Sequence, residues 1–459
     1  MLDVRSLLVG VDETVPTLDQ GWLRYVNLDN AASTPAFVSV VEAIERFLPF
    51  YASVHRGSGY KSRLSTRAYE DARQEVGRFV GADPDRDVTV FAKNTTEAIN
   101  KLARSMPFPD DAVVLTTLLE HHSNDLPWRP RARTVHVRVM PDGSLDEDDL
   151  DRRLREYAGR IAALAVTGAS NVTGVVPAIH QLAAKVHAAG GRILVDAAQL
   201  APHRPIDMRP HDDAGHLDFV ALSAHKMYAP FGSGALVGAR ACFGSVPDHR
   251  GGGTVEAVTL DDIAWADLPD REEAGSPNVV GAVALAAAAT TLTEIGRERI
   301  AAHESDLLAY ATARLAHVPG LRLHGPADLD SRVGIIPFTL AGVEHGLVAA
   351  VLGYEHAVGV RSGCFCAHPY LAHLLGHDAA AARGWARRAA GGDRRGLPGM
   401  VRMSFGCYSD TADVDRAVDG LTRIAGGEIV GSYCGDLDGE YRPVGYREPA
   451  LFAMGGPRA

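Results

Sequence analysis

The sequence contains few cysteines and no long apolar run, and these absences exclude several classes of protein. Its 459 residues include only five cysteines, an odd number spread from Cys242 to Cys434, so we expect no framework of disulfide bonds. The first residues, Met1 to Arg5, contain an early acid, and no long apolar stretch follows them. This start predicts no signal peptide.

An excess of positive charge is lacking as well. The net charge of −11 and the isoelectric point near 5.9 argue against a nucleic-acid partner or an acidic membrane. The alanine-rich stretch from Val279 to Thr291 is too short to span a bilayer. Because 46% of the residues are hydrophobic and 22% are charged, the composition is that of a soluble globular protein, long enough for two domains. We expect it to be cytoplasmic, with no nucleic-acid or membrane partner.

Two apolar runs end close to residues that can carry chemistry. The runs Gly191–Asp196 and Leu217–Leu222 are predicted to be buried strands. Asp196 closes the first, and Lys226 follows the second on a loop that Pro230 keeps out of a helix. Ligands collect beyond the carboxyl ends of parallel strands. An acid there can pair with a protonated pyridine nitrogen, and a desolvated lysine can hold the aldehyde of the same ring as a Schiff base.

This pairing is the one that pyridoxal 5′-phosphate (PLP) requires, because its charged ring acts as an electron sink. The alternative is a helix-capping acid and an unrelated lysine, and the nearby Gln199 and His225 count against it. The segments Val195-Asp196-Ala197-Ala198-Gln199 and Ser223-Ala224-His225-Lys226 resemble the two central motifs of class V PLP enzymes of fold type I. The likeness is strongest to cysteine desulfurases and selenocysteine lyases, and it covers most of residues 25–425.

The resemblance implies an α/β fold with a large, mostly parallel sheet and a smaller α+β domain. From Val279 onward long helices precede short strands, which also indicates a second domain. We expect residues 25–285 to form the PLP-binding domain, and residues 1–24 and 286–459 the smaller one. Residues 377–400, rich in Ala, Arg and Gly, look inserted and are expected to be a solvated loop, with a docking surface as the alternative. The tail from residue 428 has no assignable function.

Further polar side chains follow predicted strands and extend the cofactor site. Thr95 and Thr96 open a helix after the strand Val88–Phe91, and free N–H groups at a helix start suit a phosphate; a plain helix cap is the alternative. The Asn171 amide is expected to bind the phenolic oxygen of the cofactor, with Gln199 close by. Hydroxyl, amide, acidic and imidazole side chains make up the expected cofactor set: Thr95, Thr96, His121, Asn171, Asp196, Gln199, Ser223, His225, Lys226 and Ser276.

Several of these roles are implied by the resemblance alone. It implies that His121 stacks on the cofactor ring, and no His-Glu-x-x-His spacing follows to indicate a metal. It places Ala32 in a turn over the substrate and His55, in His55-Arg56-Gly57, at the rim of the site. It implies that Ser276 reaches the phosphate of a neighbouring subunit, which predicts a homodimer.

The cysteine loop, residues 361–369, carries two thiols beside an arginine. A cysteine in such a loop is a candidate nucleophile of low pKa; a Cys-x-Cys-x-His zinc site and small buried hydrophobes are the alternatives. The loop resembles the Arg-x-Gly-x-x-Cys segment of SUF-type desulfurases, with Arg361 at its start, which places the nucleophile at Cys366. Cys364 is an additional thiol, as in molybdenum-cofactor sulfurases, so the choice between the two stays open. Arg402 matches the arginine that clamps an amino-acid carboxylate, a task suited to a guanidinium fork.

We therefore expect a PLP-dependent cysteine desulfurase that converts L-cysteine to L-alanine and holds the sulfur as a persulfide. A C–S lyase, a selenocysteine lyase and an aminotransferase are alternatives on the same scaffold. A non-catalytic scaffold or sulfur carrier is a third class, against which the intact Lys226 and Asp196 count.

Lys226, Cys366 and His121 are the expected catalytic residues, and no metal is expected. The predicted partners are an amino-acid substrate, a second copy of the chain and a sulfur-acceptor protein. The predicted substrate contacts are Ala32, His55, Asn171, Arg361 and Arg402.

Overall fold

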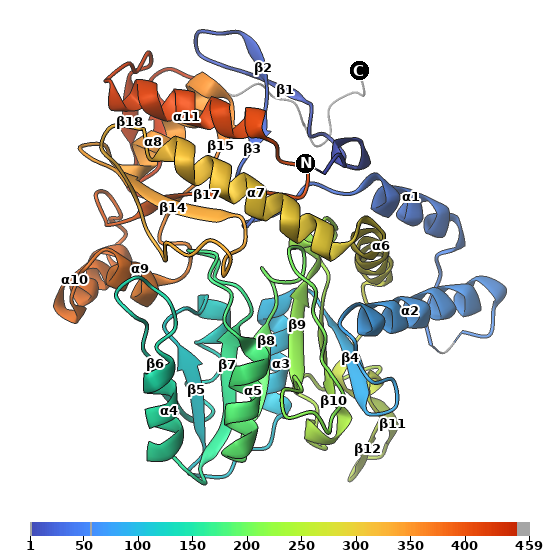
Figure 1. Cartoon of the computed structure of the whole chain (residues 1–459). Helices are drawn as coiled ribbons and strands as arrows, with labels where there is room; N and C mark the ends of the chain where they lie inside the picture. Colours follow the sequence, from blue (N-terminus) through green and yellow to red (C-terminus); the bar gives the residue numbers. More distant parts are fainter. Residues whose placement is uncertain (1, 56, 448–459) are drawn as a thin grey trace.

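The computed structural model describes residues 2–55 and 57–447 of the chain. Arg56 of the predicted rim motif and residues 448–459 of the predicted tail lie outside the described residues. Two sheets dominate the molecule: a seven-stranded sheet in the lower part of Figure 1, called here the large sheet, and a four-stranded sheet above it, called the small sheet.

The large sheet is parallel except at one strand. Its strand order is β4-β10-β9-β8-β7-β5-β6, and β10 alone pairs antiparallel with both of its neighbours, β4 and β9. The remaining neighbours pair in parallel. The strands are β4 (Asp87–Ala92), β5 (Val113–Thr117), β6 (Arg133–Val137), β7 (Ile161–Thr167), β8 (Arg192–Asp196), β9 (Phe219–Ser223) and β10 (Gly234–Ala239).

Alternation along the strands explains why helices cover both faces of the large sheet. In β8, Ile193 and Val195 belong to one hydrophobic cluster and Leu194 to another, as expected when successive side chains point to opposite faces. The first cluster includes Leu182 of helix α5 (Ile179–Ala188). The second includes Leu102 of helix α3 (Thr95–Ser105). A strand buried on both faces must be apolar throughout, which is how these runs read in the sequence.

The small sheet is antiparallel and has its own core. Its strand order is β13-β14-β17-β16, and a separate hydrophobic cluster joins it to helices α7, α8 and α11. A capping box between Asp410 and Asp413 starts α11. The elements are α7 (Arg297–Leu315), β13 (Leu321–Leu323), β14 (Ile335–Leu340), α8 (His345–His356), β16 (Arg361–Gly363), β17 (Met400–Ser404) and α11 (Thr411–Ala425).

The other helices and short strands complete the architecture. The α-helices are α1 (Val38–Phe47), α2 (Tyr60–Phe79), α4 (Glu147–Glu156), α6 (Val279–Ile295), α9 (His368–Leu374) and α10 (Ala379–Ala390). The paired short strands are β1 (Thr14–Pro16) with β2 (Trp22–Arg24), β3 (Val26–Asn27) with β15 (Val358–Gly359), β11 (Val255–Val258) with β12 (Ile263–Trp265), and β18 (Tyr433–Gly435) with β19 (Tyr441–Pro443). The 3-10 helices are η1 (Arg5–Leu7), η2 (Leu48–Phe50), η3 (His122–Asn124), η4 (Ala224–Lys226), η5 (Arg240–Cys242) and η6 (Asp270–Glu272).

The two sheets confirm the predicted fold class, whereas one local expectation is wrong. Residues 379–390, expected within a solvated loop, form helix α10, which the carboxylate of Asp378 caps by accepting the N–H groups of Ala380 and Ala381. Ala and Arg are strong helix formers, so their abundance here favours a helix over a loop. The domain boundary expected near residue 285 falls inside α6, and the division into residue ranges stays a prediction.

In the part of the chain that the structure describes, no single helix is long and apolar enough to cross a membrane. Helices α6 and α7 reach that length and composition only together, with a bend of 72° between them.

Candidate active site

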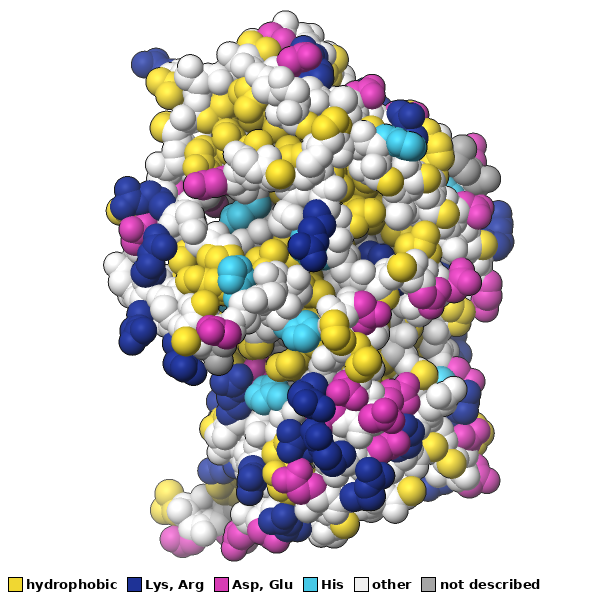
Figure 2. Space-filling view, turned by 60° about the vertical axis from the view of Figure 1, so that its left-hand side comes forward, with side chains coloured by type: hydrophobic (Ala, Val, Ile, Leu, Met, Phe, Trp, Pro, Cys, Tyr) yellow, Lys and Arg dark blue, Asp and Glu magenta, His cyan; other side chains and the backbone are white. Residues whose placement is uncertain are grey.

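A cavity of about 1180 Å³ lies between the two sheets. Residues at the carboxyl ends of β7, β8 and β9 line one side of it, and residues of β16, β17 and the cysteine loop line the other. In the space-filling view, histidine and hydrophobic side chains gather across the middle of the molecule, where its upper and lower parts meet (Figure 2). This is the edge of a parallel sheet at which ligand sites are expected.

Lys226 enters the cavity from η4, directly after β9. Burial lowers the pKa of its amine to about 8, and Arg402 acts in the same direction while Asp196 opposes both. A neutral amine is the nucleophilic form that attacks an aldehyde. At pH 7 about one tenth of Lys226 is therefore in the neutral, reactive state, far more than for an amine with the ordinary lysine pKa.

Asp196 lies at the end of β8, and its side chain is buried against the same cavity. Its Oδ1 atom accepts the N–H of Ala198 at 3.0 Å. Burial raises the pKa of the carboxyl, while the Ala198 N–H and Lys226 lower it. A cationic ring nitrogen beside this carboxylate would stabilise its charged form, because opposite charges favour ionisation.

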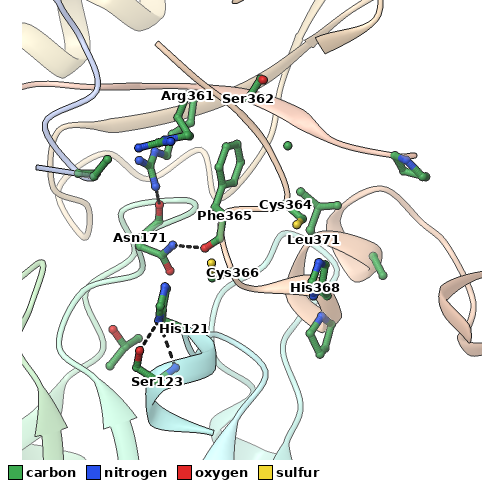
Figure 3. A pocket seen from close by; sticks show the side chains of 18 of the residues that line it. His121, Ser123, Asn171, Arg361, Ser362, Cys364, Phe365, Cys366, His368 and Leu371 are labelled. Atoms are coloured by element: carbon green, nitrogen blue, oxygen red, sulfur yellow. Dashed lines mark hydrogen bonds between the residues drawn. The ribbon is translucent and has the colours of Figure 1, made fainter. Parts of the chain in front are cut away.

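His121 stands where η3 begins, and its ring is oriented by Ser123 (Figure 3). Its Nδ1 atom accepts the Ser123 N–H at 3.1 Å and lies 2.9 Å from the Ser123 hydroxyl oxygen. Burial lowers the pKa of the imidazole to about 3, with Lys226 and other nearby positive groups contributing. The ring is therefore neutral and suits stacking against a charged aromatic group.

The start of helix α3 is suited to bind an anion. Thr95 and Thr96 line the cavity at its first turn, and Asn94 caps the helix by accepting the Glu97 N–H at 3.0 Å. The Thr95 hydroxyl is buried and has no hydrogen-bond partner within residues 2–55 and 57–447. An orphaned hydroxyl beside free helix N–H groups fits a phosphate.

Two further members of the predicted cofactor set line the cavity next to Lys226. Ser223 ends β9 and is buried. Burial lowers the pKa of His225 to about 4, and Lys226 lowers it further. Both side chains are thus uncharged where they face the cavity.

Two arginines converge on one acid that the sequence analysis did not single out. The buried Arg402 donates from Nη2 to Asp29 Oδ1 at 3.0 Å and from Nη1 to the Asn171 carbonyl oxygen at 2.8 Å. The Nε atom of Arg361 lies 3.1 Å from Asp29 Oδ2. Among the described residues the buried Arg402 Nε has no partner. Asp29 therefore fixes both guanidinium groups and leaves one donor for an acidic ligand.

Two amide side chains of the predicted set form hydrogen bonds that hold loops beside the cavity. Asn171 donates from Nδ2 to the Phe365 carbonyl oxygen at 2.7 Å, which anchors the cysteine loop (Figure 3). Gln199 donates from Nε2 to the Ala31 carbonyl oxygen at 2.6 Å and so fixes the turn that contains Ala32. Asn171, Gln199 and Ala32 all line the cavity.

The two thiols of the cysteine loop differ in their surroundings. Cys366 is exposed, and its sulfur points toward Asn171 and His121, whereas the sulfur of Cys364 lies beside Leu371 (Figure 3). Burial raises the pKa of the Cys364 thiol. Cys366 also raises the pKa of Lys226, behind the larger effects of burial and Asp196, so its thiol lies within electrostatic reach of that amine. The geometry favours Cys366 as the reacting thiol.

The backbone of the cysteine loop is unusual. Phe365 and Cys366 both have φ near 54°, in the left-handed region that non-glycine residues seldom adopt. The loop is held there from the large-sheet side, because the His122 N–H donates to the Cys366 carbonyl oxygen at 2.8 Å. Such conformations persist only where surrounding contacts enforce them, and they cluster at functional sites.

Two predicted site residues do not reach this cavity in the single chain. His55 pairs with Glu70, with 3.6 Å between Nε2 and Oε1, and its ring lies 5.6 Å from that of Tyr69. Glu70 raises the pKa of this imidazole. Ser276 is exposed in the loop before α6. Their roles in substrate binding and in a neighbouring subunit stay predictions.

Helix α10 forms an outer wall that the sequence analysis did not predict. Ala382, Trp385, Ala386 and Ala389 of this helix line the cavity beyond the cysteine loop. Their i, i+3, i+4, i+7 spacing in the sequence is a signal of one helix face, whereas their place at the cavity follows only from the tertiary fold.

The sequence matches the family model of aminotransferase class-V over residues 26–417. Two curated relatives are a cysteine desulfurase of Pectobacterium atrosepticum, 37% identical over 409 residues (86% of this chain and 92% of the relative), and a probable cysteine desulfurase of Streptomyces coelicolor, 34% identical over 415 residues (87% and 92%).

Two solved structures are similar in fold over most of the chain. One is the apo cysteine desulfurase of Thermococcus onnurineus NA1, with a TM-score of 0.77, 31% identity, and coverage of 88% of this chain and 95% of that one. The other is the cysteine desulfurase CsdA of Escherichia coli, with a TM-score of 0.75, 29% identity, and coverage of 93% and 98%. Because these matches span nearly the whole fold around the cavity, the chain belongs to the class-V aminotransferase family.

Proposed function

We propose that the protein is a PLP-dependent cysteine desulfurase that converts L-cysteine to L-alanine and holds the sulfur on Cys366. One observation carries the proposal: Lys226, Asp196 and Cys366 line a single cavity in a chain of the class-V family. The curated relatives named as cysteine desulfurases, 33 to 37% identical over most of the chain, support it.

The residues present fit the cofactor. Lys226, Asp196 and His121 line one cavity; Lys226 would hold the aldehyde of the cofactor, Asp196 would pair with its ring nitrogen and His121 would stack on its ring face. The unpartnered Thr95 hydroxyl at the start of α3 suits its phosphate. When bound, PLP supplies a cationic ring that withdraws electrons from the substrate carbon.

Substrate orientation falls to Arg402. Its unpartnered Nε and its planar guanidinium suit an α-carboxylate, because such a fork binds carboxylates with fixed geometry. Asp29 holds the group in place. The amino acid is thereby positioned between the amine of Lys226 and the thiol of Cys366.

Lys226 moves the protons. Its neutral Nζ accepts the proton from the substrate Cα. One proton then goes to the carbon that becomes the alanine methyl group and one returns to Cα; the second of these two protons is the one that the Cys366 thiol releases on becoming a thiolate. The Cys366 thiolate attacks the substrate sulfur, so a bond forms between the two sulfurs and the substrate Cβ–S bond breaks. Cysteine and the enzyme thiol thus become alanine and an enzyme persulfide, and no external oxidant or reductant is needed.

The thiol distinguishes this reaction from its alternatives. A C–S lyase, a selenocysteine lyase or an aminotransferase on the same scaffold needs no enzyme nucleophile at Cys366. We expect Cys366→Ala to abolish alanine formation from L-cysteine and Cys364→Ala to retain most of it. The measurements are alanine, sulfide and the intact mass of each variant. Of the two variants, only Cys364→Ala should show one added sulfur.

The outcomes of this experiment separate the candidates. Undiminished alanine production by Cys366→Ala would refute the desulfurase as described. An added sulfur mapped to Cys364 would keep the chemistry and reassign the nucleophile. Loss of activity in both variants would show that the cysteine loop, rather than one thiol, is required.

We also infer a homodimer, in which Ser276 serves the phosphate of the other subunit. Its exposed position outside the cavity of its own chain supports this arrangement. A protein that accepts the sulfur and a cytoplasmic location stay predictions.

A further inference from the structure

A cluster of one carboxylate and two imidazoles lies at the opposite end of the large sheet from the cavity. Asp87 is the first residue of β4, whereas the cavity lies beyond the other end of that strand. His211 and His216 belong to the connection between β8 and β9 (residues 197–218). The nitrogen and oxygen atoms that the three side chains offer lie within 4.8 Å of one another.

His216 has an unused ring nitrogen. Its Nδ1 lies 2.8 Å from the Arg209 carbonyl oxygen, and because a carbonyl only accepts, Nδ1 carries the proton. Its Nε2 then holds a lone pair, is buried, and has no hydrogen-bond partner in the described parts of the chain. A histidine whose other ring N–H binds a backbone carbonyl is the usual form of a metal ligand.

The other two members are also held in place. His211 Nε2 lies 3.0 Å from Asp87 Oδ1, and the two imidazole rings are 4.1 Å apart between centroids. The second carboxylate oxygen of Asp87 accepts the Asp83 N–H at 2.9 Å. A hydrogen bond accounts for the pair of His211 and Asp87, but it leaves the buried lone pair of His216 unexplained.

Burial makes the cluster a formed site. Asp87 and His216 are 4% and 3% exposed, and the side chain of His211 is 10% exposed.

We propose that Asp87, His211 and His216 bind a divalent transition metal ion of the zinc type. Two imidazole nitrogens and one carboxylate oxygen select such an ion over magnesium or calcium, which prefer oxygen ligands. Zinc–nitrogen bonds of about 2.1 Å in a tetrahedron put neighbouring ligand atoms about 3.4 Å apart. The ligand atoms here lie within 4.8 Å of one another, with His211 Nε2 and Asp87 Oδ1 3.0 Å apart, so small movements bring them to this spacing, and water supplies the fourth ligand.

The ion fixes a connection that leads to the catalytic lysine. The segment 197–218 continues directly into β9, and Lys226 follows that strand. Ligation joins this segment to the start of β4. The role is structural, because the ion lies at the end of the sheet away from the reacting groups.

The test uses the PLP-loaded full chain with Cys364→Ser, Cys366→Ala and Cys434→Ser as the parent, which removes the two thiols of the cysteine loop and the exposed Cys434 thiol as competing zinc ligands. After incubation with zinc chloride and dialysis, we expect about one zinc per chain and a Tm raised by about 2 °C or more. Adding His216→Gln or Asp87→Asn should weaken zinc binding at least about tenfold. Absorption of Co²⁺ in place of zinc reports the coordination geometry.

His180→Gln in the same parent is the matched control. His180 Nδ1 lies 2.7 Å from the Gly215 carbonyl oxygen, so this change removes a contact of the same connection without touching the proposed ligands. It should keep one zinc per chain.

A parent that retains no zinc and shows no Tm change overturns the proposal. Undiminished zinc in His216→Gln overturns it as well, and equal loss in His180→Gln overturns the assignment of ligands. If His216→Gln fails to fold, the parent and Asp87→Asn decide the question.

Discussion

Burial sets the charge state of the side chains that line the cavity. It lowers the pKa of Lys226 to about 8 and those of His121 and His225 to about 3 and 4. The base is therefore available near neutral pH, and the two imidazoles carry no charge that would repel a cationic ring. Arg402 keeps its charge because Asp29 pairs with it.

The carboxylate of Asp196 should matter for its charge more than for its shape. We expect Asp196→Asn to bind PLP and to lower kcat by about 10² or more, since it removes a preorganised charge from the reacting system. The measurement is alanine formation from L-cysteine, together with visible absorbance to show that the cofactor is bound. Asp111→Asn, at an exposed position, is the control. Turnover near wild type in Asp196→Asn would show that this carboxylate has no electronic role.

The lowered pKa of Lys226 predicts how cofactor uptake depends on pH. Only the neutral amine reacts with an aldehyde, so the uptake rate of the cofactor-free protein should rise about tenfold per pH unit below pH 8 and level off above it. Because Arg402 lowers this pKa, Arg402→Gln should move the midpoint to higher pH. Stopped-flow absorbance measures both curves. A rate that does not change between about pH 6 and 9 contradicts the pKa given for the amine.

At the scale of elements, the start of helix α3 and the cap of helix α10 both contribute to the cavity. Helix α3 directs its first turn at the cavity, and α10 closes the outer side of it. The cap of α10 is a single side chain, Asp378, whose Oδ1 accepts two backbone N–H groups at 2.9 and 2.8 Å. The wall of the cavity therefore depends on one exposed acid.

Removing this cap should loosen the wall. Asp378→Ala is expected to cost about 1 kcal/mol of helix stability, which corresponds to roughly fivefold faster amide exchange in residues 380–390. Hydrogen exchange read by mass spectrometry measures this change. Asp419→Ala, at an exposed position in α11, should leave exchange in α10 as it was. Equal exchange in both variants would show that the cap does not stabilise α10.

Strand ends could be predicted from the sequence, but contacts between distant segments could not. Asp196, Ser223 and Asn171 follow buried apolar runs, and runs of this kind reveal where a parallel sheet ends. Asp29 gains its role only when the turn after β3 meets β16 and β17. Helix α10 was missed because a stretch rich in Ala, Arg and Gly was interpreted as a solvated loop. Ala and Arg have high helix propensity, and Ala382, Trp385, Ala386 and Ala389 follow the spacing of one helix face.

At the scale of the whole molecule, the site is shared between the two sheets. The proposed base and cofactor contacts follow strands of the large sheet, while the proposed thiol nucleophile and carboxylate-binding arginine come from the cysteine loop and the small sheet. The homodimer that we propose would add a third contributor through Ser276. This arrangement explains why the sequence motifs that resemble the family lie more than one hundred residues apart: residues from both sheets are needed at the same cavity.

Mixed dimers test the role of Ser276. We expect Ser276→Ala to weaken PLP binding about tenfold or more, as for a lost hydrogen bond to a charged group. Co-expression with Lys226→Ala should restore tight binding in half of the sites of the mixed dimers, or about a quarter of all sites if the chains pair at random, since each mixed dimer contains one site with both residues intact. A PLP titration followed by absorbance measures this. A mixture that behaves as the average of the two variants would show that Ser276 serves its own chain or none.

The cysteine loop is fastened to the large-sheet side by two bonds, from Asn171 Nδ2 to Phe365 O and from His122 N to Cys366 O. Both bonds end on backbone carbonyl oxygens of the loop, so they hold the backbone around Cys366 to the large-sheet side, although the loop continues from β16 of the small sheet. The position of the sulfur relative to the amine of Lys226 therefore depends on these two bonds more than on the packing of the small sheet.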